Sequence, residues 1–148
     1  AVGEGKNVSI KVEADSTIVA ERPIYFNYKG AWTGGHDVVG ATSLSDTYYF
    51  AEGYTGDGFE EWLCLMNPAA TATTAQVTYM FDDGSTESTN VPIGATSRQT
   101  VNVNDAVGEG KNVSIKVEAD STIVAERPIY FNYKGAWTGG HDVVGYTP

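Results

Sequence analysis

Two His-Asp dipeptides are the residues of this 148-residue chain whose types come nearest to catalytic machinery. They are His36-Asp37 and His141-Asp142. A hydrolytic His-Asp pair also needs a nucleophile beside the imidazole, and no serine or cysteine motif accompanies either dipeptide. Zinc would need three or four ligands, and two histidines with the single Cys64 give no zinc spacing. The sequence therefore predicts structural loop roles for both dipeptides, and no catalytic residue.

Acidic side chains gather in two stretches that are expected to be loops. Carboxylate oxygens are ligands that calcium prefers, and the candidate ligands are Asp57, Glu60, Asp82 and Asp83. Neither stretch follows the EF-hand spacing or a glycine-rich calcium repeat. Solvated turns are the favoured interpretation. Calcium as a stiffener of the loops stays open, and we expect no other cofactor or metal.

Trp32 and Trp137 occupy equivalent places in the stretch Lys-Gly-Ala-Trp-Thr-Gly-Gly-His-Asp, which occurs twice and is expected to be a loop. Aromatic rings in exposed loops can stack on sugar rings, so carbohydrate binding or adhesion is the alternative function. The flanking glycines also let the backbone fold each tryptophan inward, against its own domain or the next one. Packing is the favoured interpretation of the two.

Charge and composition exclude several classes of partner. The chain has 19 acidic and 9 basic residues, and the basic ones are scattered singly. A nucleic-acid surface needs clustered Lys and Arg, and the negative field would repel an anionic membrane. No apolar run approaches the roughly 20 residues that span a bilayer. We expect no nucleic-acid partner and no membrane insertion, and we expect the lone Cys64 to be buried as a small apolar residue.

An internal repeat organises the chain. Residues 1–40 recur without change as residues 106–145, at an offset close to the length of an immunoglobulin-like domain. We therefore predict that residues 1–40 are the C-terminal part of a preceding repeat and that residues 41–148 are a complete unit. The chain has no initiator methionine, so we expect a processed chain or a stretch of something longer. Either a tandem array is cut at this point, or the natural subunit carries an extra copy of its last strands.

Alternation of apolar and polar side chains, broken by turn residues, predicts strands along the whole unit. The predicted strands are 47–51, 61–66, 76–81, 86–91, 97–103, 112–118 and 122–133. Asp82-Asp83-Gly84-Ser85 predicts a hairpin, Ala119-Asp120-Ser121 predicts a turn, and Pro128 predicts an edge position or a bulge. No segment has helical periodicity. The pattern predicts an all-β, immunoglobulin-like antiparallel sandwich of about seven strands and Greek-key type, with an extra N-terminal β-hairpin.

The extra hairpin, with strands expected near residues 7–14 and 17–28, lacks the strands that precede it in a complete unit. A lone hairpin with an apolar face is marginally stable in water, and burial of that face contributes about 25 cal/mol per Å². Because the two copies are identical, either one fits the core formed by residues 42–105. We predict an assembly interface at Val8, Ile10, Val12, Ile18, Val19, Ile24, Tyr25 and Phe26.

One copy can close its own domain while the other completes a neighbouring molecule. Such a contact joins different surfaces of the two molecules, so it propagates instead of closing. We expect the partners to be copies of this chain, joined head to tail in a filament or a tandem-repeat stalk outside the cell. The expected function is structural and non-enzymatic, the expected mechanism is strand complementation, and surface glycans are the alternative partners.

Five motifs occur in order along the repeat unit. They are Tyr-Tyr-Phe-Ala-Glu-Gly-Tyr-Thr at 48–55, Glu-Trp-Leu-Cys-Leu-Met-Asn-Pro at 61–68, Ser-Arg-Gln-Thr-Val-Asn-Val-Asn-Asp at 97–105, Val-Ala-Glu-Arg-Pro-Ile-Tyr-Phe at 124–131 and Gly-Gly-His-Asp-Val-Val-Gly at 139–145. With these motifs the unit resembles an immunoglobulin-like repeat of large secreted and cell-surface proteins of bacteria, notably actinobacteria. The resemblance implies a tandem, extracellular arrangement. The family has no agreed biochemical activity, so the resemblance transfers no functional residue.

Overall fold

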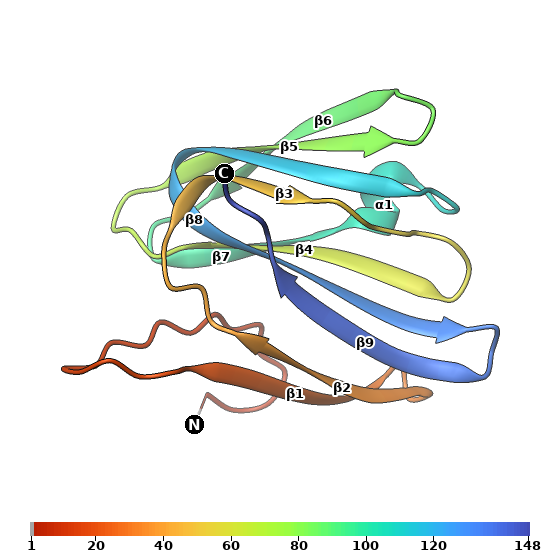
Figure 1. The fold of residues 1–148 in the computed structure, drawn as a ribbon, viewed down its shortest axis with the longest axis horizontal. Coiled ribbons are helices and arrows are strands. Elements are labelled where there is room, and N and C mark those ends of the chain that lie inside the picture. Colours follow the sequence, from red (N-terminus) through yellow and green to blue (C-terminus); the bar gives the residue numbers. More distant parts are fainter. Residues whose placement is uncertain (1) are drawn as a thin grey trace.

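The computed structural model describes residues 2–148, and this part of the chain forms nine β-strands and one short helix (Figure 1). The strands are β1 (Glu21–Tyr28), β2 (Trp32–Val39), β3 (Ser45–Phe50), β4 (Phe59–Asn67), β5 (Thr73–Phe81), β6 (Thr86–Ile93), β7 (Ser97–Asn102), β8 (Val113–Tyr133) and β9 (Trp137–Val144), and the helix is α1 (Val103–Val107). The strands pair in antiparallel fashion. The all-β antiparallel prediction is confirmed.

β8 joins the two halves of one curled sheet. Its first part, Val113 to Ala119, pairs with β5 and β3. Its last part, Val124 to Tyr133, pairs with β4 and β9. Since both halves share β8, the sheet curls like a half-barrel over its core instead of forming two sheets with no strand in common. The finer prediction, a Greek-key immunoglobulin sandwich, is not confirmed by this topology.

Two local predictions within β8 are wrong. The turn expected at Ala119-Asp120-Ser121 does not form, because the strand continues through these residues while it changes partners from β5 to β4. Pro128 lies at neither an edge nor a bulge, since it pairs with Asp142 of β9 and β4 lies on the other side. The register to β4 omits Arg127 and Pro128, so the missing amide of proline breaks no ladder bond there.

Two elements differ from the expectation of a helix-free unit with glycine-rich loops. α1 is a five-residue helix that begins where the Asn102 side chain accepts a hydrogen bond from the Asp105 amide at 3.3 Å. β9 contains the Trp-Thr-Gly-Gly-His-Asp stretch that was expected to be a loop, and it pairs with β8 along its length. Glycine suits this strand because a Cβ at Gly139 would lie 2.8 Å from the Phe131 ring.

The core lies between the two halves of the curled sheet. Its fully buried apolar side chains come from β3, β4, β5, β8, the end of β6 and α1, and the largest are Tyr48, Leu63, Leu65, Tyr79, Ile93, Ile115 and Ile123. Two charged side chains, Glu61 and Arg127, are buried with them. Because many of these buried residues belong to β8, this late strand of the repeat unit completes the core of residues 41–148.

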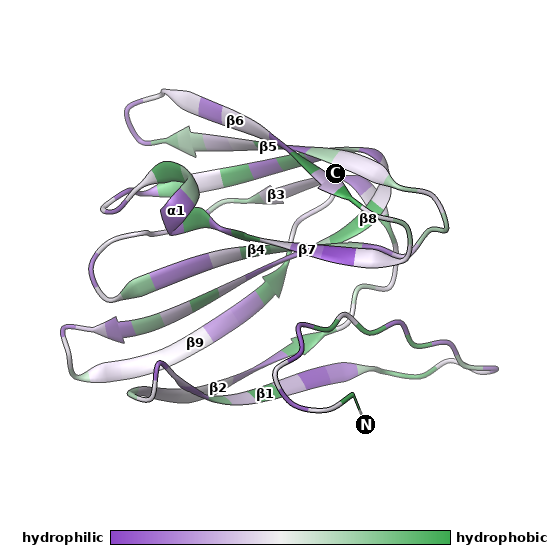
Figure 2. Cartoon of the chain, turned by 180° about the vertical axis from the view of Figure 1, so that it is seen from behind, coloured by the Kyte–Doolittle hydropathy of each residue, from purple (hydrophilic) through white to green (hydrophobic). Residues whose placement is uncertain are grey.

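The N-terminal copy folds differently. β1 and β2 form a separate two-stranded sheet that lies beside β9, on the side of the sheet away from the core (Figures 1 and 2). Residues 2–20 contain no strand, so the strand expected at 7–14 is absent and β1 starts only at Glu21. The physical reason is the lack of neighbours: the identical residues 112–119 of the second copy have β3 and β5 beside them.

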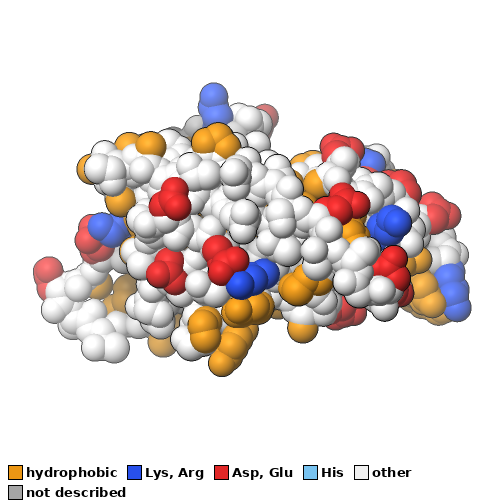
Figure 3. All heavy atoms as spheres, turned by 90° about the horizontal axis from the view of Figure 1, so that it is seen from above, with side chains coloured by type: hydrophobic (Ala, Val, Ile, Leu, Met, Phe, Trp, Pro, Cys, Tyr) orange, Lys and Arg blue, Asp and Glu red, His pale blue; other side chains and the backbone are white. Residues whose placement is uncertain are grey.

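The surface agrees with the net charge of −10. On the face shown in Figure 3, acidic side chains are scattered and Lys and Arg side chains stand singly among them. Within residues 2–148, no helix has the length and apolar character that crossing a bilayer requires.

Candidate functional site

The two identical segments lie in different environments, and this difference marks the candidate assembly site. In the second copy, residues 113–119 pair with β3 and β5, and Ile115 is fully buried. In the first copy, residues 8–14 belong to no strand, and Ile10 keeps 60% of its surface exposed. The same sequence is therefore a buried strand in one copy and an exposed, unpaired segment in the other.

The structure divides the eight predicted assembly residues into two groups. Six are exposed: Val8, Ile10, Val12, Ile18, Val19 and Tyr25. Ile24 and Phe26 are half-buried on the side of β1 that packs against the rest of the chain. Successive side chains of a strand point to opposite faces, so Tyr25 lies opposite Ile24 and Phe26. Tyr25 therefore cannot share one face with Ile24 and Phe26, and the assembly interface stays a prediction.

The hairpin of β1 and β2 packs through β1 against the sheet formed by β4, β8 and β9. It contacts the side of this sheet that is turned away from the core, and we call this side the outer face. Arg22, Ile24, Phe26 and Tyr28 alternate toward it. In the second copy, the residue equivalent to Arg22 is Arg127, which is buried in the core. The hairpin thus covers the outer face with the side that faces inward in a complete unit.

Arg22 links the hairpin to two carboxylates of the outer face. Its Nη1 donates to Glu126 Oε2 at 3.2 Å, and its Nη2 donates to Asp142 Oδ2 at 2.5 Å. Asp142 is buried, and this burial, followed by the nearby Glu126 charge, raises the pKa of Asp142 to about 6 although Arg22 opposes the shift. The ion pair therefore contains a carboxyl group that takes up a proton in mildly acidic solution.

Tyr130 is the aromatic anchor of the same contact. Its ring stacks on Tyr28, with centroids 4.8 Å apart and planes 13° apart. It also meets the Phe26 ring edge-on, at 4.9 Å and 85°. Both geometries are favourable for aromatic pairs. The hairpin is also hydrogen-bonded to β4, because the Lys29 amine and the Tyr28 hydroxyl both donate to the carboxylate of Glu60.

Close backbone approach explains the glycines of the duplicated strands. A Cβ added at Gly34 of β2 would lie 3.1 Å from the Cα of Gly139 of β9. Next to this contact, the Thr138 hydroxyl donates to the Thr33 carbonyl at 2.9 Å. The two copies of the same strand therefore lie against each other with little space between their backbones.

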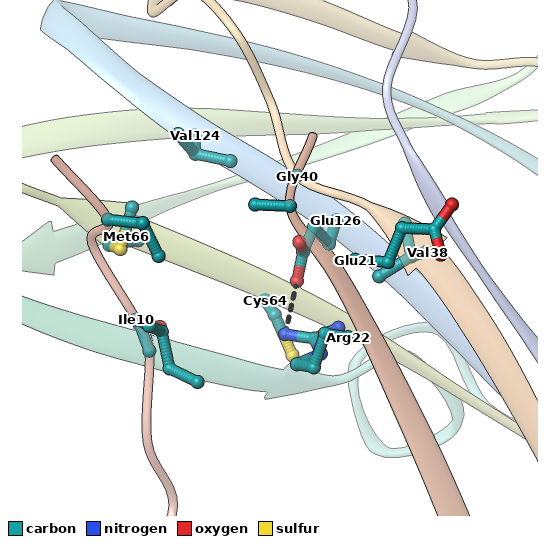
Figure 4. A pocket seen from close by; sticks show the side chains of 12 residues that line it. Ile10, Glu21, Arg22, Val38, Gly40, Cys64, Met66, Val124 and Glu126 are labelled. Atoms are coloured by element: carbon teal, nitrogen blue, oxygen red, sulfur yellow. Dashed lines mark hydrogen bonds and ion pairs between the residues drawn. The ribbon is translucent and has the colours of Figure 1, made fainter. Parts of the chain in front are cut away.

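The hairpin leaves a cavity of about 660 Å³ above the outer face, which we call the interlayer cavity. Trp62, Tyr130 and Asp142 line it from the outer face, and Arg22, Tyr28 and His36 line it from the hairpin. A smaller cavity of about 130 Å³ adjoins it and shares Ser9, Arg22, Cys64 and Glu126 with it (Figure 4). A volume of roughly 300–1,000 Å³ is typical of small-molecule sites, so the interlayer cavity is large enough for a ligand.

Cys64 lies on the outer face of β4 instead of in the core, and it is half-buried. Arg98 Nη2 donates to its sulfur at 3.4 Å, and Arg98 Nε donates to Ser9 Oγ at 3.3 Å. Burial raises the pKa of the Cys64 thiol. The thiol is therefore held in its protonated, less nucleophilic form at neutral pH.

The two His-Asp dipeptides lie on strands, so the loop prediction is wrong for both. On a strand, the histidine and the aspartate of one dipeptide point to opposite sides, which keeps them from acting as a pair. His36 lines the interlayer cavity while Asp37 is exposed. Burial lowers the pKa of His36 and of His141. Both imidazoles are consequently neutral at pH 7.

Of the four calcium candidates, three accept hydrogen bonds from other groups of the protein and the fourth is exposed to solvent. Glu60 accepts hydrogen bonds from the hairpin, and Asp57 is exposed. Asp83 accepts from the amide and hydroxyl of Ser85, and Asp82 accepts from Asn112 at 3.2 Å. In the part of the chain that the structure describes, no three His, Cys, Asp or Glu side chains gather as metal ligands.

The two tryptophans begin strands instead of lying within loops. Trp137 is exposed and stacks on Tyr133, with centroids 5.9 Å apart and planes 27° apart. Trp32 is half-buried, with Tyr28 beside it and Lys29 Nζ at 5.6 Å from its ring centre. Trp32 therefore packs against its own hairpin, whereas Trp137 and Tyr133 present a stacked aromatic pair at the surface.

Sequence reasoning missed the buried charges. Arg127 Nη1 lies 3.9 Å from Glu61 Oε1 and donates to the Glu52 carbonyl. Burial raises the pKa of Glu61 to about 7, although Arg127 opposes the shift. The sequence did contain an indication that Glu61 is buried, because the two-residue period places Glu61 on the same side of β4 as Leu63. The other side of β4 carries Trp62 and Met66, and apolar residues on both sides of a strand indicate that the outer face is also covered.

Comparison with known proteins finds a likeness of fold. No family model matches the chain, and no curated protein matches its sequence. The crystal structure of Thermotoga maritima 1070 superimposes with a TM-score of 0.65 at 20% sequence identity, and the match covers 70% of this chain and 95% of that chain. The Anabaena sensory rhodopsin transducer superimposes with a TM-score of 0.52 at 17% identity, and the match covers 60% of this chain and 99% of that chain. At these identities, the likeness shows that the chain shares an all-β fold with both proteins.

Proposed function

We propose that this chain is a structural, non-enzymatic module of an extracellular tandem-repeat protein or filament, whose units link head to tail by strand complementation. In this mechanism, residues 8–28 take the place in a neighbouring unit that residues 113–133 take in their own unit. The observation that supports the proposal is the contrast between the copies: one sequence is buried at 113–119 and exposed at 8–14.

Apolar burial is the main source of free energy for such a link. Val8, Ile10, Val12 and Ile18 correspond to residues of β8 that are buried in the core. Moving one such side chain from water into a core contributes about 1.5–3 kcal/mol. Backbone ladders to the equivalents of β3 and β5 would add specificity, because residues 113–119 make these ladders in the complete unit.

The link has two possible settings with the same geometry. In one long polypeptide, the accepting strands belong to the preceding repeat. Between separate chains, the acceptor is a unit whose own residues 106–145 have been displaced. Both settings join different surfaces of two units, so the arrangement continues along a line. In both settings the unit would be an immunoglobulin-like repeat of a cell-surface protein. A net charge of −10 would keep such an array soluble.

Insertion also has a cost, because β8 is one continuous strand. Residues 8–20 cannot extend a neighbouring sheet as β8 does unless β1 leaves the outer face with them. The contacts of Arg22 and Tyr130 are then lost. Docking of the hairpin on its own outer face therefore competes with assembly.

Light scattering and electron microscopy of the whole chain and of residues 41–148 test the proposal. We expect the whole chain to form high-mass linear particles and the trimmed chain to stay monomeric, because the trimmed chain keeps a complete core and loses the donor segment. Equal assembly of the two proteins would show that residues 1–40 are not the link.

A second candidate function is carbohydrate binding, and the exposed Tyr133–Trp137 pair favours it. An exposed tryptophan ring that a second ring supports offers an apolar surface to the face of a sugar ring. Binding of the chain to surface glycans would then be abolished by loss of Trp137, and assembly would be unchanged.

A further inference from the structure

The exposed side of the hairpin repeats the surface that the hairpin covers. Three exposed side chains of β1 and β2 point away from the rest of the chain, and they are Glu21, Tyr25 and Asp37. Their equivalents in the second copy are Glu126, Tyr130 and Asp142. These second-copy residues hold the hairpin, two of them through ion pairs with Arg22 and the third through aromatic contacts. We call this side of either copy the accepting side, and in the first copy it is uncovered.

The side of the hairpin that docks on the outer face also occurs in both copies. It includes Arg22 and Tyr28 in the first copy, and Arg127 and Tyr133 hold the same positions in the second. Each copy thus has a docking side and an accepting side that fit each other. Because the two sides differ, such hairpins can stack in a series, with the docking side of one on the accepting side of the next. The single chain contains one step of this series.

Strand complementation between separate chains displaces residues 106–145 from the core of the accepting unit. Arg127 and Ile129, which are buried in the single chain, would then lose their contacts. The inserted segment of the neighbouring chain would at the same time bring its own accepting side to the outer face, at the place that the second copy holds in the single chain. The displaced segment would therefore meet the same set of residues that binds the hairpin in the single chain.

We propose that the accepting side of β1 and β2 is a docking site for residues 126–144 of a neighbouring molecule of the same chain. That molecule is the one whose core accepts the donated segment, so the proposal rests on strand complementation and adds the place where the displaced segment is held. Arg127 of the displaced segment bonds Glu21 and Asp37, and its aromatic side chains cover Tyr25. Contacts of the same kind as those lost when β1 leaves the outer face are thereby formed again.

The displaced segment is long enough to reach this site. α1 ends at Val107, so residues 108–125 connect it to the displaced hairpin. These residues span up to about 60 Å when they are extended, whereas the nine residues of β4, over which the hairpin lies, span about 30 Å. Residues 2–20 of the first copy already follow such a course, since they form no strand and Ser9 accepts a hydrogen bond from Arg98 of β7.

Tyr25→Ala and Tyr130→Ala, made separately in the whole chain, test the proposal by light scattering, electron microscopy and thermal melting. Tyr25 is 87% exposed in the single chain, so Tyr25→Ala should leave the melting temperature of the single chain unchanged. It should raise the concentration at which linear particles form about tenfold, because the aromatic contact is present only in the assembly. Tyr130→Ala should do the reverse. The single chain then loses its contact with the hairpin and melts at a lower temperature, and assembly begins at about a tenth of the concentration.

A second matched pair changes charge instead of aromatic contact. Glu21→Lys places a cation against Arg127 only in the assembly, whereas Glu126→Lys places one against Arg22 only in the single chain, so the first should weaken assembly and the second should favour it. If the unchanged chain forms no linear particles, strand complementation is wrong and the docking with it. If the unchanged chain assembles, and Tyr25→Ala and Glu21→Lys assemble at the same concentration as it does, strand complementation stands and the docking of the displaced segment is overturned.

Discussion

Ile10 and Ile115 hold the same position in two identical segments, yet Ile10 is 60% exposed and Ile115 is completely buried. The difference comes from strand pairing, because β3 and β5 pair with residue 115 and no strand pairs with residue 10. One chain thus contains an internal control for every contact that the duplicated sequence makes.

Replacing Ile10 with Asp should block assembly and leave the stability of the folded unit unchanged. The side chain contacts water in the single chain, but it would carry a charge into the core of an accepting unit. The matched variant, Ile115→Asp, should destabilise the fold by more than about 4 kcal/mol, since it buries an unpaired charge. Light scattering and urea unfolding measure the two effects. Assembly of Ile10→Asp at the level of the unchanged chain would contradict strand complementation.

Replacing Arg127 with Leu should destabilise the unit by about 3–5 kcal/mol, because it leaves the buried Glu61 without its cation. Arg22→Leu changes the equivalent residue of the first copy and should destabilise the unit less than Arg127→Leu does. The carboxyl group left behind can take up a proton in both variants, but the Arg22 side chain is 31% exposed, whereas Arg127 is buried and also bonds the Glu52 carbonyl. Chemical unfolding followed by tryptophan fluorescence measures both values. Similar losses for the two variants would show that the copies are less different than the structure indicates.

The unit should become less stable as the pH rises from about 4.5 to 7. Folding raises the pKa of Glu61 from 4.5 to about 7, so the folded chain binds more protons than the unfolded chain in this window. The free energy of unfolding then falls with rising pH by about 1.4 kcal/mol for each unit of pKa difference. Asp142 contributes in the same direction between 3.8 and about 6.

Melting temperatures measured from pH 4.5 to 8 test this dependence. Glu61→Gln removes the titrating group and should flatten most of the slope. Asp142→Asn should remove only the part of the slope below about pH 6. An unchanged slope in Glu61→Gln would mean that other groups govern the pH dependence.

Replacing Trp137 with Ala should abolish any binding of the chain to surface polysaccharide, because it removes one ring of the exposed aromatic pair. Trp32→Ala changes the equivalent residue of the first copy, which is half-buried beside Tyr28, and should have little effect. A pull-down with insoluble polysaccharides gives the comparison. If the polysaccharide retains both variants equally, the Tyr133–Trp137 pair does not bind carbohydrate.

The sequence by itself determined the strands that have a clear alternation and a turn at their end. β3, β4, β5, β6 and β7 lie where the two-residue period places them, because side chains that alternate between core and water fix both the strand and its orientation. The repeat also predicted that either of the two identical copies would fit the core formed by residues 42–105, so that the other copy would need a partner elsewhere. The positions of these strands follow from residues that are close together in the chain.

Only the tertiary structure decided what the two copies become. Residues 8–14 and 113–119 have the same propensities, and the presence of β3 and β5 makes one of them a strand. The position of Asp142 under Arg22 joins residues from different copies, so no local pattern contains it. The course of β8 through Asp120 depends on a change of partner strands in the same way. Pairing and burial are long-range interactions, and they override local propensity wherever a segment can find more than one partner.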